Sequence, residues 1–280
     1  MTPVPGPRTY VVVLNWNGLA DTRACLASLA PACDDATAVL VVDNGSTDGS
    51  PEILRREFPR IRVLETGANL LFAGGNNAGI RAALDDGAEA IMLLNNDTTV
   101  DPRFLGAMTA RLRSWPDAGI VAPKILYHAR PELIWYAGGE ISAWTGTMRH
   151  RGIRERDDGR FDTPGETAYA SGCCFLTTRE VVERIGMLDE RYHMYTEDAD
   201  FCMRARRAGY RIVYEPGARV WHKVSVSAGG HLSAFKLRNK FISNFRFFAR
   251  YAAWYQWAVF PWMNIAVNAA AACRYVLGRR

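Results

Sequence analysis

The stretch that decides the fold is Val39-Leu40-Val41-Val42, followed directly by Asp43-Asn44-Gly45-Ser46-Thr47-Asp48-Gly49. A second stretch follows the same pattern, because Ile91-Met92-Leu93-Leu94 leads into Asn95-Asn96-Asp97-Thr98. Short apolar runs that end in turn residues are typical of buried parallel strands. In an open α/β sheet, ligands bind just beyond the carboxyl ends of such strands. Asp43 and Asp97 therefore predict a site that handles a nucleotide and a metal.

The first hundred residues alternate between strand and helix patterns. We predict strands at 10–14, 39–42, 61–64 and 91–94, and helices at 21–29 (capped by Asp21), from Ser50 or Pro51 onward, and at 73–84. This alternation predicts a parallel sheet with right-handed crossovers. Later predictions are strands at 119–122, 173–177 and 211–214, an exposed loop at 149–166, and helices at 103–114, 179–185 and 197–208, the last running from Thr196 as N-cap to Gly209.

Length and composition are those of an ordinary globular protein, with 280 residues, 49% hydrophobic and 22% charged. The six cysteines show no CxxC or CxxH spacing, and the Pro-rich start lacks a basic region followed by an apolar core. We therefore expect a cytoplasmic protein without a secretory signal, whose reduced cysteines hold no zinc.

The net charge of +5 is unevenly distributed along the chain. No acidic residue follows Glu215, whereas the last 65 residues carry ten Lys or Arg side chains. This is not the pattern of a nucleic-acid-binding domain. It suits an enzyme whose tail meets an anionic surface.

The two aspartates at the strand ends each allow two interpretations. Asp43 can accept hydrogen bonds from a ribose or a base, with phosphate at the following helix N-terminus, or it can simply form an Asx-turn. Asp97, with Asn95, offers oxygen ligands that a hard divalent cation shares with substrate phosphates. The alternative for this pair is a capped strand end.

Three further segments carry candidate residues. Residues 67–79 are rich in Gly and Asn, which permit close backbone approach and can contact a base or a sugar, but their spacing fits neither a P-loop nor a dinucleotide fingerprint. Glu197, Asp198 and Asp200 cluster at a predicted helix start, where interaction with the helix dipole alone would explain them. His222 is either a ligand or a surface residue.

Together these motifs resemble family 2 glycosyltransferases over residues 8–250, and most closely the rhamnosyltransferase-like members that work on bacterial surface polysaccharides. The shared motifs, in order, are Asn15-Trp16-Asn17-Gly18, Asp43-Asn44-Gly45-Ser46-Thr47-Asp48-Gly49, Gly74-Gly75-Asn76-Asn77, Asn95-Asn96-Asp97 and Glu197-Asp198-x-Asp200-Phe201-Cys202-x-Arg204. The resemblance implies an α/β chain with a GT-A fold, in which a Rossmann-like nucleotide-binding sheet is fused to an acceptor-binding half. It also implies inverting transfer of a sugar from a nucleotide sugar.

The resemblance also implies roles for individual residues. Asp198 would be the general base, with Glu197 beside it, while Asp97 and His222 would bind a divalent cation, Mg²⁺ or Mn²⁺. A dTDP-, UDP- or GDP-sugar donor would be bound by Asn15, Asn17, Asp43, Ser46, Gly74, Asn76, Asn77 and Asn96. Because a helix N-terminus lowers the pKa of a carboxylate, burial or Glu197 must raise that of Asp198 if it is to act as a base.

The sequence departs from the family pattern in two places. Asn95 replaces the first Asp of the commoner Asp-x-Asp motif, which leaves fewer charges to hold the metal. The processive Gln-x-x-Arg-Trp motif is absent, which favours the addition of a single sugar to a lipid-linked or small glycoside acceptor. Residues 171–174 occupy the place of the family's acceptor-side loop.

The C-terminal residues predict a different kind of segment. At about 100° per residue, residues 235–252 form a helix with Leu237, Phe241, Ile242, Phe245, Phe248 and Ala249 on one side and Lys236, Lys240, Arg246 and Arg250 on the other. Residues 251–273 then carry no charge but three Trp side chains. An interfacial membrane helix is favoured over packing on the catalytic domain and over a membrane span.

We therefore expect a catalytic domain at 8–222, divided into a nucleotide-sugar half (8–97) and a metal and acceptor half (98–222). A membrane-associating helical segment at 231–280 would place the protein at the inner face of the cell membrane. Two other function classes are a nucleotide-sugar-forming nucleotidyltransferase and a non-catalytic sugar- or membrane-binding module. The first usually needs a basic Gly-rich loop after the first strand, and Asp97 and Asp198 together argue against the second.

Overall fold

The computed structural model describes residues 8–142, 144–145, 147–192, 195–224, 234–260 and 262–263. In the helix that starts at residue 234, side chains are described at Asn239 and from Ile242 onward.

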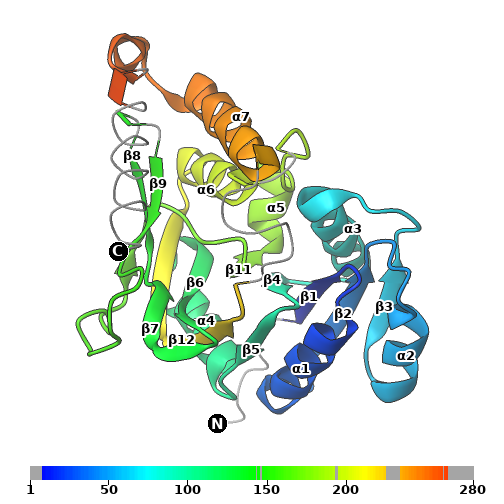
Figure 1. The fold of residues 1–280 in the computed structure, drawn as a ribbon. Coiled ribbons are helices and arrows are strands. Elements are labelled where there is room, and N and C mark those ends of the chain that lie inside the picture. Colours follow the sequence, from blue (N-terminus) through cyan, green and yellow to red (C-terminus); the bar gives the residue numbers. More distant parts are fainter. Residues whose placement is uncertain are drawn as a thin grey trace, which may run out of the picture.

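Four parallel strands form the first part of the sheet: β1 (Thr9–Asn15), β2 (Thr37–Asp43), β3 (Arg62–Glu65) and β4 (Ala90–Asn95). Their spatial order is β4-β1-β2-β3. The crossovers contain α1 (Leu19–Leu29) with η1 (Ala30–Ala32), then α2 (Ser50–Glu57), then α3 (Leu71–Asp85). In Figure 1, α1 and α2 lie on one side of these strands and α3 on the other. The predicted alternation and parallel pairing are confirmed.

The same sheet continues beyond β4 and has ten strands in the described part of the chain. β11 (Cys174–Thr178) runs antiparallel between β4 and β6 (Ala118–Tyr127), and β12 (Arg211–His222) runs parallel to β6. Shorter strands are β5 (Thr98–Val100), β7 (Arg130–Tyr136) and β10 (Gly165–Glu166), while β8 (Gly139–Ser142) and β9 (Thr147–His150) form a separate hairpin. The helices are α4 (Phe104–Ser114), α5 (Arg179–Ile185) and α6 (Glu197–Arg207), all within one residue of the prediction.

The prediction of an exposed loop at 149–166 is partly wrong. Its ends belong to β9 and β10, and its middle is anchored to the sheet by Lys124 of β6. The buried ammonium group of Lys124 donates to Asp157 Oδ1 at 2.6 Å and also pairs with Asp162. A buried cation needs such counter-charges. The acidic side chains of this segment therefore compensate an internal charge.

One predicted helix cap is wrong, and the other is confirmed in position but lacks a capping hydrogen bond. Asp21 lies in the first turn of α1, and Gly18 is the residue that precedes the helix. Thr196 precedes α6 as predicted, but its φ is +79° and its side chain makes no capping hydrogen bond. Gly209 follows α6 with a φ of +95°, as expected for a residue that ends a helix.

Glycines of α3 bring this helix close to the sheet. A Cβ atom at Gly79 would lie 2.4 Å from Val12 Cγ1, and one at Gly75 would lie 2.5 Å from Leu14 Cδ1. These glycines therefore serve helix–sheet packing, with the buried strand residues of β1 directly beneath them.

The predicted helix near the C-terminus is confirmed as α7 (Ala234–Tyr251), which lies over α5 and α6 in Figure 1. Phe247 is part of the hydrophobic core, and Phe248 stacks on Phe260 with ring centroids 3.5 Å apart. The stack forms because η2 (Trp254–Ala258) turns the chain back toward α7. Part of the predicted apolar face is thus covered by the protein itself.

We expected the basic side of this helix to be free to meet an anionic surface. This expectation is wrong for the two arginines whose contacts are described. Arg246 lies over the ring of Tyr192, and Arg250 pairs with Asp189 and Asp200. Lys236 and Lys240 are outside the described side chains. Both arginines therefore contact residues between positions 189 and 200.

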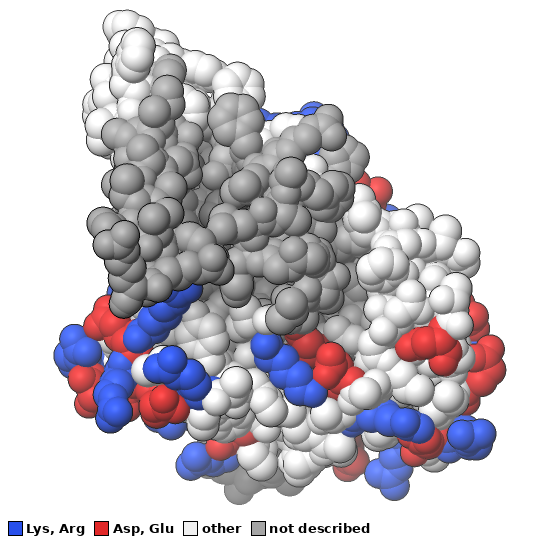
Figure 2. Space-filling model, viewed as in Figure 1, with Lys and Arg blue, Asp and Glu red and all other residues white. Residues whose placement is uncertain are grey.

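Apolar side chains remain exposed around η2. Trp254 is 86% and Trp262 74% exposed. The others with substantial exposure are Ile242, Phe245, Tyr255, Trp257, Val259 and Met263. In Figure 2 the projection that carries η2 shows no charged side chain. In the described ranges, no helix has the length and apolar character needed to cross a membrane. The part of the uncharged run beyond residue 263 lies outside those ranges.

We expect Gly79→Ala to lower the free energy of unfolding by about 1–3 kcal/mol, because its Cβ would overlap the Val12 side chain. Gly106→Ala is the matched control, since nothing lies within 4 Å of its Cβ position in α4. That control should stabilise the protein by up to about 1 kcal/mol. Urea denaturation measures both, and equal effects would contradict the close packing of α3.

Candidate active site

Asn15, the last residue of β1, joins the strand ends on either side of it. Its Nδ2 donates to Asp43 Oδ1 at 2.8 Å, and its Oδ1 accepts from Asn96 Nδ2 at 3.3 Å. The register places Asn15 beside Asp43, and its neighbour Leu14 beside Asn95. Asn15 is fully buried, so its side chain joins the strand ends from inside the protein. We call the carboxyl ends of β1, β2 and β4, with the loops that follow them, the rim.

Asp43 forms the Asx-turn that was one of its two interpretations. Its Oδ2 accepts from the backbone N–H of Ser46 at 2.9 Å, and only 2% of the residue is exposed. Ser46 Oγ in turn accepts from the N–H of Asn17, whose Oδ1 accepts from Thr47 N–H at 2.7 Å. Asn17 has a φ of +49°, which is uncommon for a residue with a side chain. Asp43 thus fixes a loop in which Asn17 and Thr47 are exposed.

Asp97 and His222 are brought together by two strands. β5 pairs with β12 so that His222 lies opposite Thr98, the residue after Asp97. The backbone N–H of Lys223 also donates to the carbonyl oxygen of Asp97 at 2.9 Å. As a result, His222 Nε2 lies 3.1 Å from Asp97 Oδ1, and both side chains are largely buried.

This pair fits a divalent cation. An octahedral ion with ligands at about 2.1 Å has neighbouring ligands about 3 Å apart, which matches the spacing of Asp97 Oδ1 and His222 Nε2. In the described ranges, no group of three or more His, Cys, Asp or Glu side chains could hold a metal ion. A cation held by one carboxylate and one imidazole would take its other ligands from phosphate and water oxygens.

The Gly- and Asn-rich motif lies within α3. Asn77 donates to the carbonyl oxygen of Leu188 and to Glu190, both at 2.9 Å, and it accepts from the N–H of Leu188. Asn76 donates to the carbonyl oxygen of Phe72 within the helix. Both side chains are buried. The Asn77 contacts therefore connect α3 to the segment that follows α5, whereas the Asn76 contact stays within the helix. A Cβ atom at Gly74 would lie 2.8 Å from Leu70 Cβ, at the residue that precedes α3.

Glu197 and Asp198 begin α6 and form the acidic centre of the site. Asp198 Oδ2 accepts from the N–H of Gly172 at 2.8 Å, and its Oδ1 accepts from the N–H of Ala199 at 2.7 Å. Glu197 is 7% exposed, and its Oε2 has no hydrogen-bond partner in the described part of the chain. Asp198 keeps partial exposure. Of the two, Asp198 is stabilised as a carboxylate by backbone donors.

Burial raises the pKa of Glu197 to about 8, and the adjacent Asp198 charge adds to this effect. Burial also raises the pKa of Asp198, against the N–H groups of Gly172 and Ala199, which lower it. Burial therefore raises the pKa of Asp198 against the lowering effect of the helix N-terminus, as expected. Glu197 is therefore the member of the pair that favours its neutral form, and Asp198 is the member that backbone donors stabilise as a carboxylate.

A short backbone path connects this acidic pair to the rim. The N–H of Asn95, at the end of β4, donates to the carbonyl oxygen of Cys173 at 2.9 Å. The preceding residue, Gly172, donates to Asp198. Segment 171–173 therefore holds the start of α6 beside the strand end that leads to Asp97.

Sequence reasoning missed two contributors to this arrangement. Gly172 acts through its backbone N–H, which carries no side-chain signal, although segment 171–174 had been placed on the acceptor side. Trp135 of β7 contacts His222 edge to face, with centroids 4.7 Å apart. The strand that carries Trp135 was not predicted, because its first residues are polar and exposed.

Comparisons with known proteins agree on one group. The model of the family described as "Glycosyl transferase family 2" matches residues 10–186. An N-acetylglucosaminyl-diphospho-decaprenol L-rhamnosyltransferase of Mycobacterium tuberculosis is 30% identical over 245 residues, which are 80% of each chain. The low-salt glycan biosynthesis hexosyltransferase Agl10 of Haloferax volcanii is 24% identical over 86% of this chain and 76% of its own length.

Two solved structures show the same fold. The mannosyltransferase PcManGT of Pyrobaculum calidifontis, in complex with GDP-Man and Mn²⁺, aligns with a TM-score of 0.66 and 19% identity over 98% of this chain and 76% of its own. GalNAc-T7 with UDP, GalNAc and Mn²⁺ aligns with a TM-score of 0.65 and 13% identity over 81% of this chain. This chain spans about half of that enzyme, 46% of its length. The predicted GT-A fold is confirmed.

We expect Asp97→Asn to weaken Mn²⁺ binding at least about tenfold. Removing a residue that only hydrogen-bonds to a metal ligand already weakens metal binding by about tenfold or more, and the loss of a ligand should weaken it at least as much. The measurement is the free Mn²⁺ signal in electron paramagnetic resonance, with UDP, dTDP and GDP each added in turn. Asp101→Asn is the control, since this carboxylate lies just beyond β5 and contacts Arg103. Equal Mn²⁺ affinity in the two variants would show that Asp97 is not a ligand.

Proposed function

The chain belongs to glycosyl transferase family 2, and from this premise we propose that it transfers one sugar, with inversion, from a nucleotide-diphosphate sugar to a hydroxyl group of a lipid-linked or small glycoside acceptor. Family membership makes it a glycosyltransferase of the rhamnosyltransferase-like subgroup. The nucleotidyltransferase and non-catalytic alternatives are therefore set aside. The sugar that we propose is transferred is rhamnose or another hexose, from a dTDP-, UDP- or GDP-sugar.

One observation carries this proposal: the side chain of Asp198 accepts a hydrogen bond from Gly172 beside the strand end that leads to the Asp97 and His222 pair. Inverting transfer needs a base for the acceptor hydroxyl and a place for the donor diphosphate. Two separate parts of the site would supply the base and the diphosphate site. The acidic pair comes from α6, and the diphosphate site from the rim.

The proton of the acceptor hydroxyl would pass to Asp198 as its oxygen attacks the sugar. Two backbone N–H groups stabilise Asp198 as a carboxylate, while burial keeps its pKa above that of an exposed aspartate. Glu197 favours its neutral form because burial raises its pKa. A second negative charge beside the base, which would repel the donor diphosphate, is thereby avoided.

The rim would bind the donor. Asp97 and His222 would hold a divalent cation, Mg²⁺ or Mn²⁺, which when bound neutralises charge on the departing diphosphate. Asn17, Ser46 and Asn96 remain accessible at the rim for the nucleotide, over the buried Asn15 and Asp43 that fix their loops. Gly74, Asn76 and Asn77 would act indirectly, through the position of α3.

The acceptor is proposed to be lipid-linked, in cell-surface polysaccharide or glycoconjugate biosynthesis. The Mycobacterium tuberculosis relative is named for a decaprenol-linked acceptor. Exposed Trp254 and Trp262 fit the membrane–water interface, where Trp side chains are enriched. The protein would therefore work at the inner face of the membrane, held there by this aromatic surface and by the basic tail.

We expect Asp198→Asn to lower kcat by about 10²–10⁴-fold, the usual contribution of a general base, while donor affinity stays unchanged. Steady-state transfer and thermal-shift titration with the donor measure the two quantities. Near-wild-type turnover would rule out Asp198 as the base.

Glu197→Gln tests the partner carboxyl group through pH dependence. Burial raises the pKa of Glu197 from 4.5 to about 8 on folding. The wild type should therefore lose stability progressively between about pH 4.5 and about pH 8, and should lose activity as the proton leaves near pH 8. Gln stays neutral throughout, so this variant should retain activity above pH 8. Parallel loss of kcat in both proteins would contradict this assignment.

We expect the double variant Trp254→Ala, Trp262→Ala to bind anionic vesicles about tenfold or more weakly, because each Trp buries a large apolar surface in lipid. Sedimentation with vesicles of phosphatidylglycerol and phosphatidylcholine measures the binding. Trp16→Ala is the control, since Trp16 is 53% exposed at the distant rim. If all three proteins bind alike, the aromatic surface does not contact lipid.

A further inference from the structure

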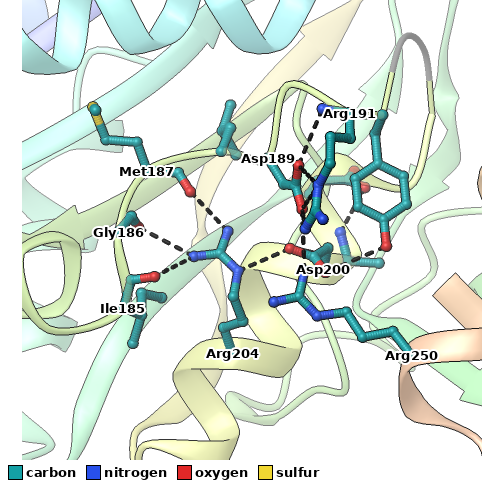
Figure 3. Close-up of polar contacts among 12 residues, drawn as sticks. Ile185, Gly186, Met187, Asp189, Arg191, Asp200, Arg204 and Arg250 are labelled. Atoms are coloured by element: carbon teal, nitrogen blue, oxygen red, sulfur yellow. Dashed lines mark hydrogen bonds and ion pairs between the residues drawn. The ribbon is translucent and has the colours of Figure 1, made fainter. Parts of the chain in front are cut away.

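A buried carboxylate sits one turn from the start of the catalytic helix α6. Asp200 is fully buried, and its Oδ2 accepts from Arg204 Nε at 2.8 Å along the same helix. Arg204 also donates to the carbonyl oxygens of Ile185, Gly186 and Met187. Figure 3 shows this guanidinium group joining α6 to the segment that follows α5. One side of Asp200 is therefore compensated from within the catalytic body.

The other side of Asp200 is compensated by α7. Arg250 Nη1 donates to Asp200 Oδ1 at 3.0 Å and to Asp189 Oδ2 at 3.1 Å, so it bridges two carboxylates. The neighbouring Tyr251 hydroxyl donates to the same Asp200 oxygen at 2.7 Å. Without α7, this oxygen would keep only the longer contact from Tyr192, at 3.3 Å. A buried charge left with so few donors is strongly unfavourable.

A second contact from α7 reaches the turn that precedes the acidic pair. Tyr195 and Thr196 have φ values of +70° and +79°, in a region that side chains other than glycine rarely adopt. The Thr196 hydroxyl donates to Asn244 Oδ1 of α7 at 3.2 Å. Glu197 and Asp198 follow this turn directly. Both ends of the first turn of α6 are thus tied to the same distant helix.

We propose that Arg250 is a positioning residue, which through Asp200 holds the first turn of α6 so that Asp198 stays against Gly172 and faces the acceptor. This inference rests on the proposed function for its catalytic consequence. Its structural part stands independently: α7 fixes α6. Losing Arg250 would leave the Asp200 charge short of donors. The turn would then open to admit water, and the Asp198 to Gly172 hydrogen bond would weaken.

The test compares Arg250→Gln with Arg191→Gln in the full-length protein. Arg191 is the matched control, because it pairs with Asp189 in the same cluster and makes no hydrogen bond to Asp200. The first measurement is hydrogen–deuterium exchange in peptides covering 195–201 and 170–174, with a peptide over β1 to report that the core is folded. We expect Arg250→Gln to speed exchange at least about tenfold in the first two peptides only, and Arg191→Gln to stay within about twofold of wild type.

A double variant shows whether Arg250 acts through Asp200. Asp200→Asn removes the buried charge that Arg250 compensates, so adding it to Arg250→Gln should restore slow exchange and part of kcat. In glycosyl transfer, Arg250→Gln alone should lower kcat about tenfold with donor KM within about twofold, because the base is displaced and the rim is not.

The outcomes separate the two proposals. Unchanged exchange in Arg250→Gln would overturn the positioning role, whatever the enzyme transfers. A double variant no better than Arg250→Gln would overturn the route through Asp200. Faster exchange at α6 in a protein whose wild type transfers no sugar would support the link from α7 while overturning the proposed function.

Discussion

The structure depends on the hydrogen-bonded register of β1 between β2 and β4. This register sets Asn15 beside Asp43 and Leu14 beside Asn95, so three strand ends finish at one edge. Once they are level, a single buried amide can join them, and Asn15 does so by donating to Asp43 and accepting from Asn96. A shift of one residue would turn these side chains to the opposite face of the sheet. The position of every rim residue follows from this pairing.

The second determinant is the compensation of buried charge. Carboxylates in the interior need donors or a proton, and the site uses both. Asp198 has two backbone N–H groups, Asp200 has two guanidinium groups and two tyrosine hydroxyls, and Glu197 favours its neutral form because burial raises its pKa. Three acidic residues within four positions are therefore stabilised in three different ways. The helix dipole alone, an explanation the sequence allowed, does not account for these contacts.

Much of the fold could be predicted because continuous apolar runs and turn residues mark buried strands directly. β1, β2 and β4 were found in this way, and the ordered motifs led to the family. β5, β7 and β8 were missed because they are short or carry polar exposed residues, and β5 pairs with β12, a strand that comes much later in the chain. The hydrogen bond from the Gly172 N–H to Asp198 could not be predicted either. Backbone donors are placed by tertiary structure and leave no mark in the residue type.

The C-terminal helix shows where amphipathic patterning is ambiguous. The pattern separated an apolar from a basic side, but it could not show that the partner of Arg250 lies fifty residues earlier, on α6. Charge on a helix indicates a counter-charge somewhere, either on a surface or inside the same chain. Here Arg250 finds its counter-charge inside and Arg246 lies over the ring of Tyr192, while the exposed aromatic residues of η2 remain for the outside.

The contact between Arg250 and Asp200 also has a consequence for biosynthesis. The ribosome releases the strands and the acidic helix long before it releases α7, since the chain emerges from its N-terminus. Until then, the Asp200 carboxylate has Arg204 and Tyr192 as its described donors. The nascent enzyme therefore completes the charge compensation of α6 only after α7 has emerged, when the aromatic segment that follows α7 is also emerging.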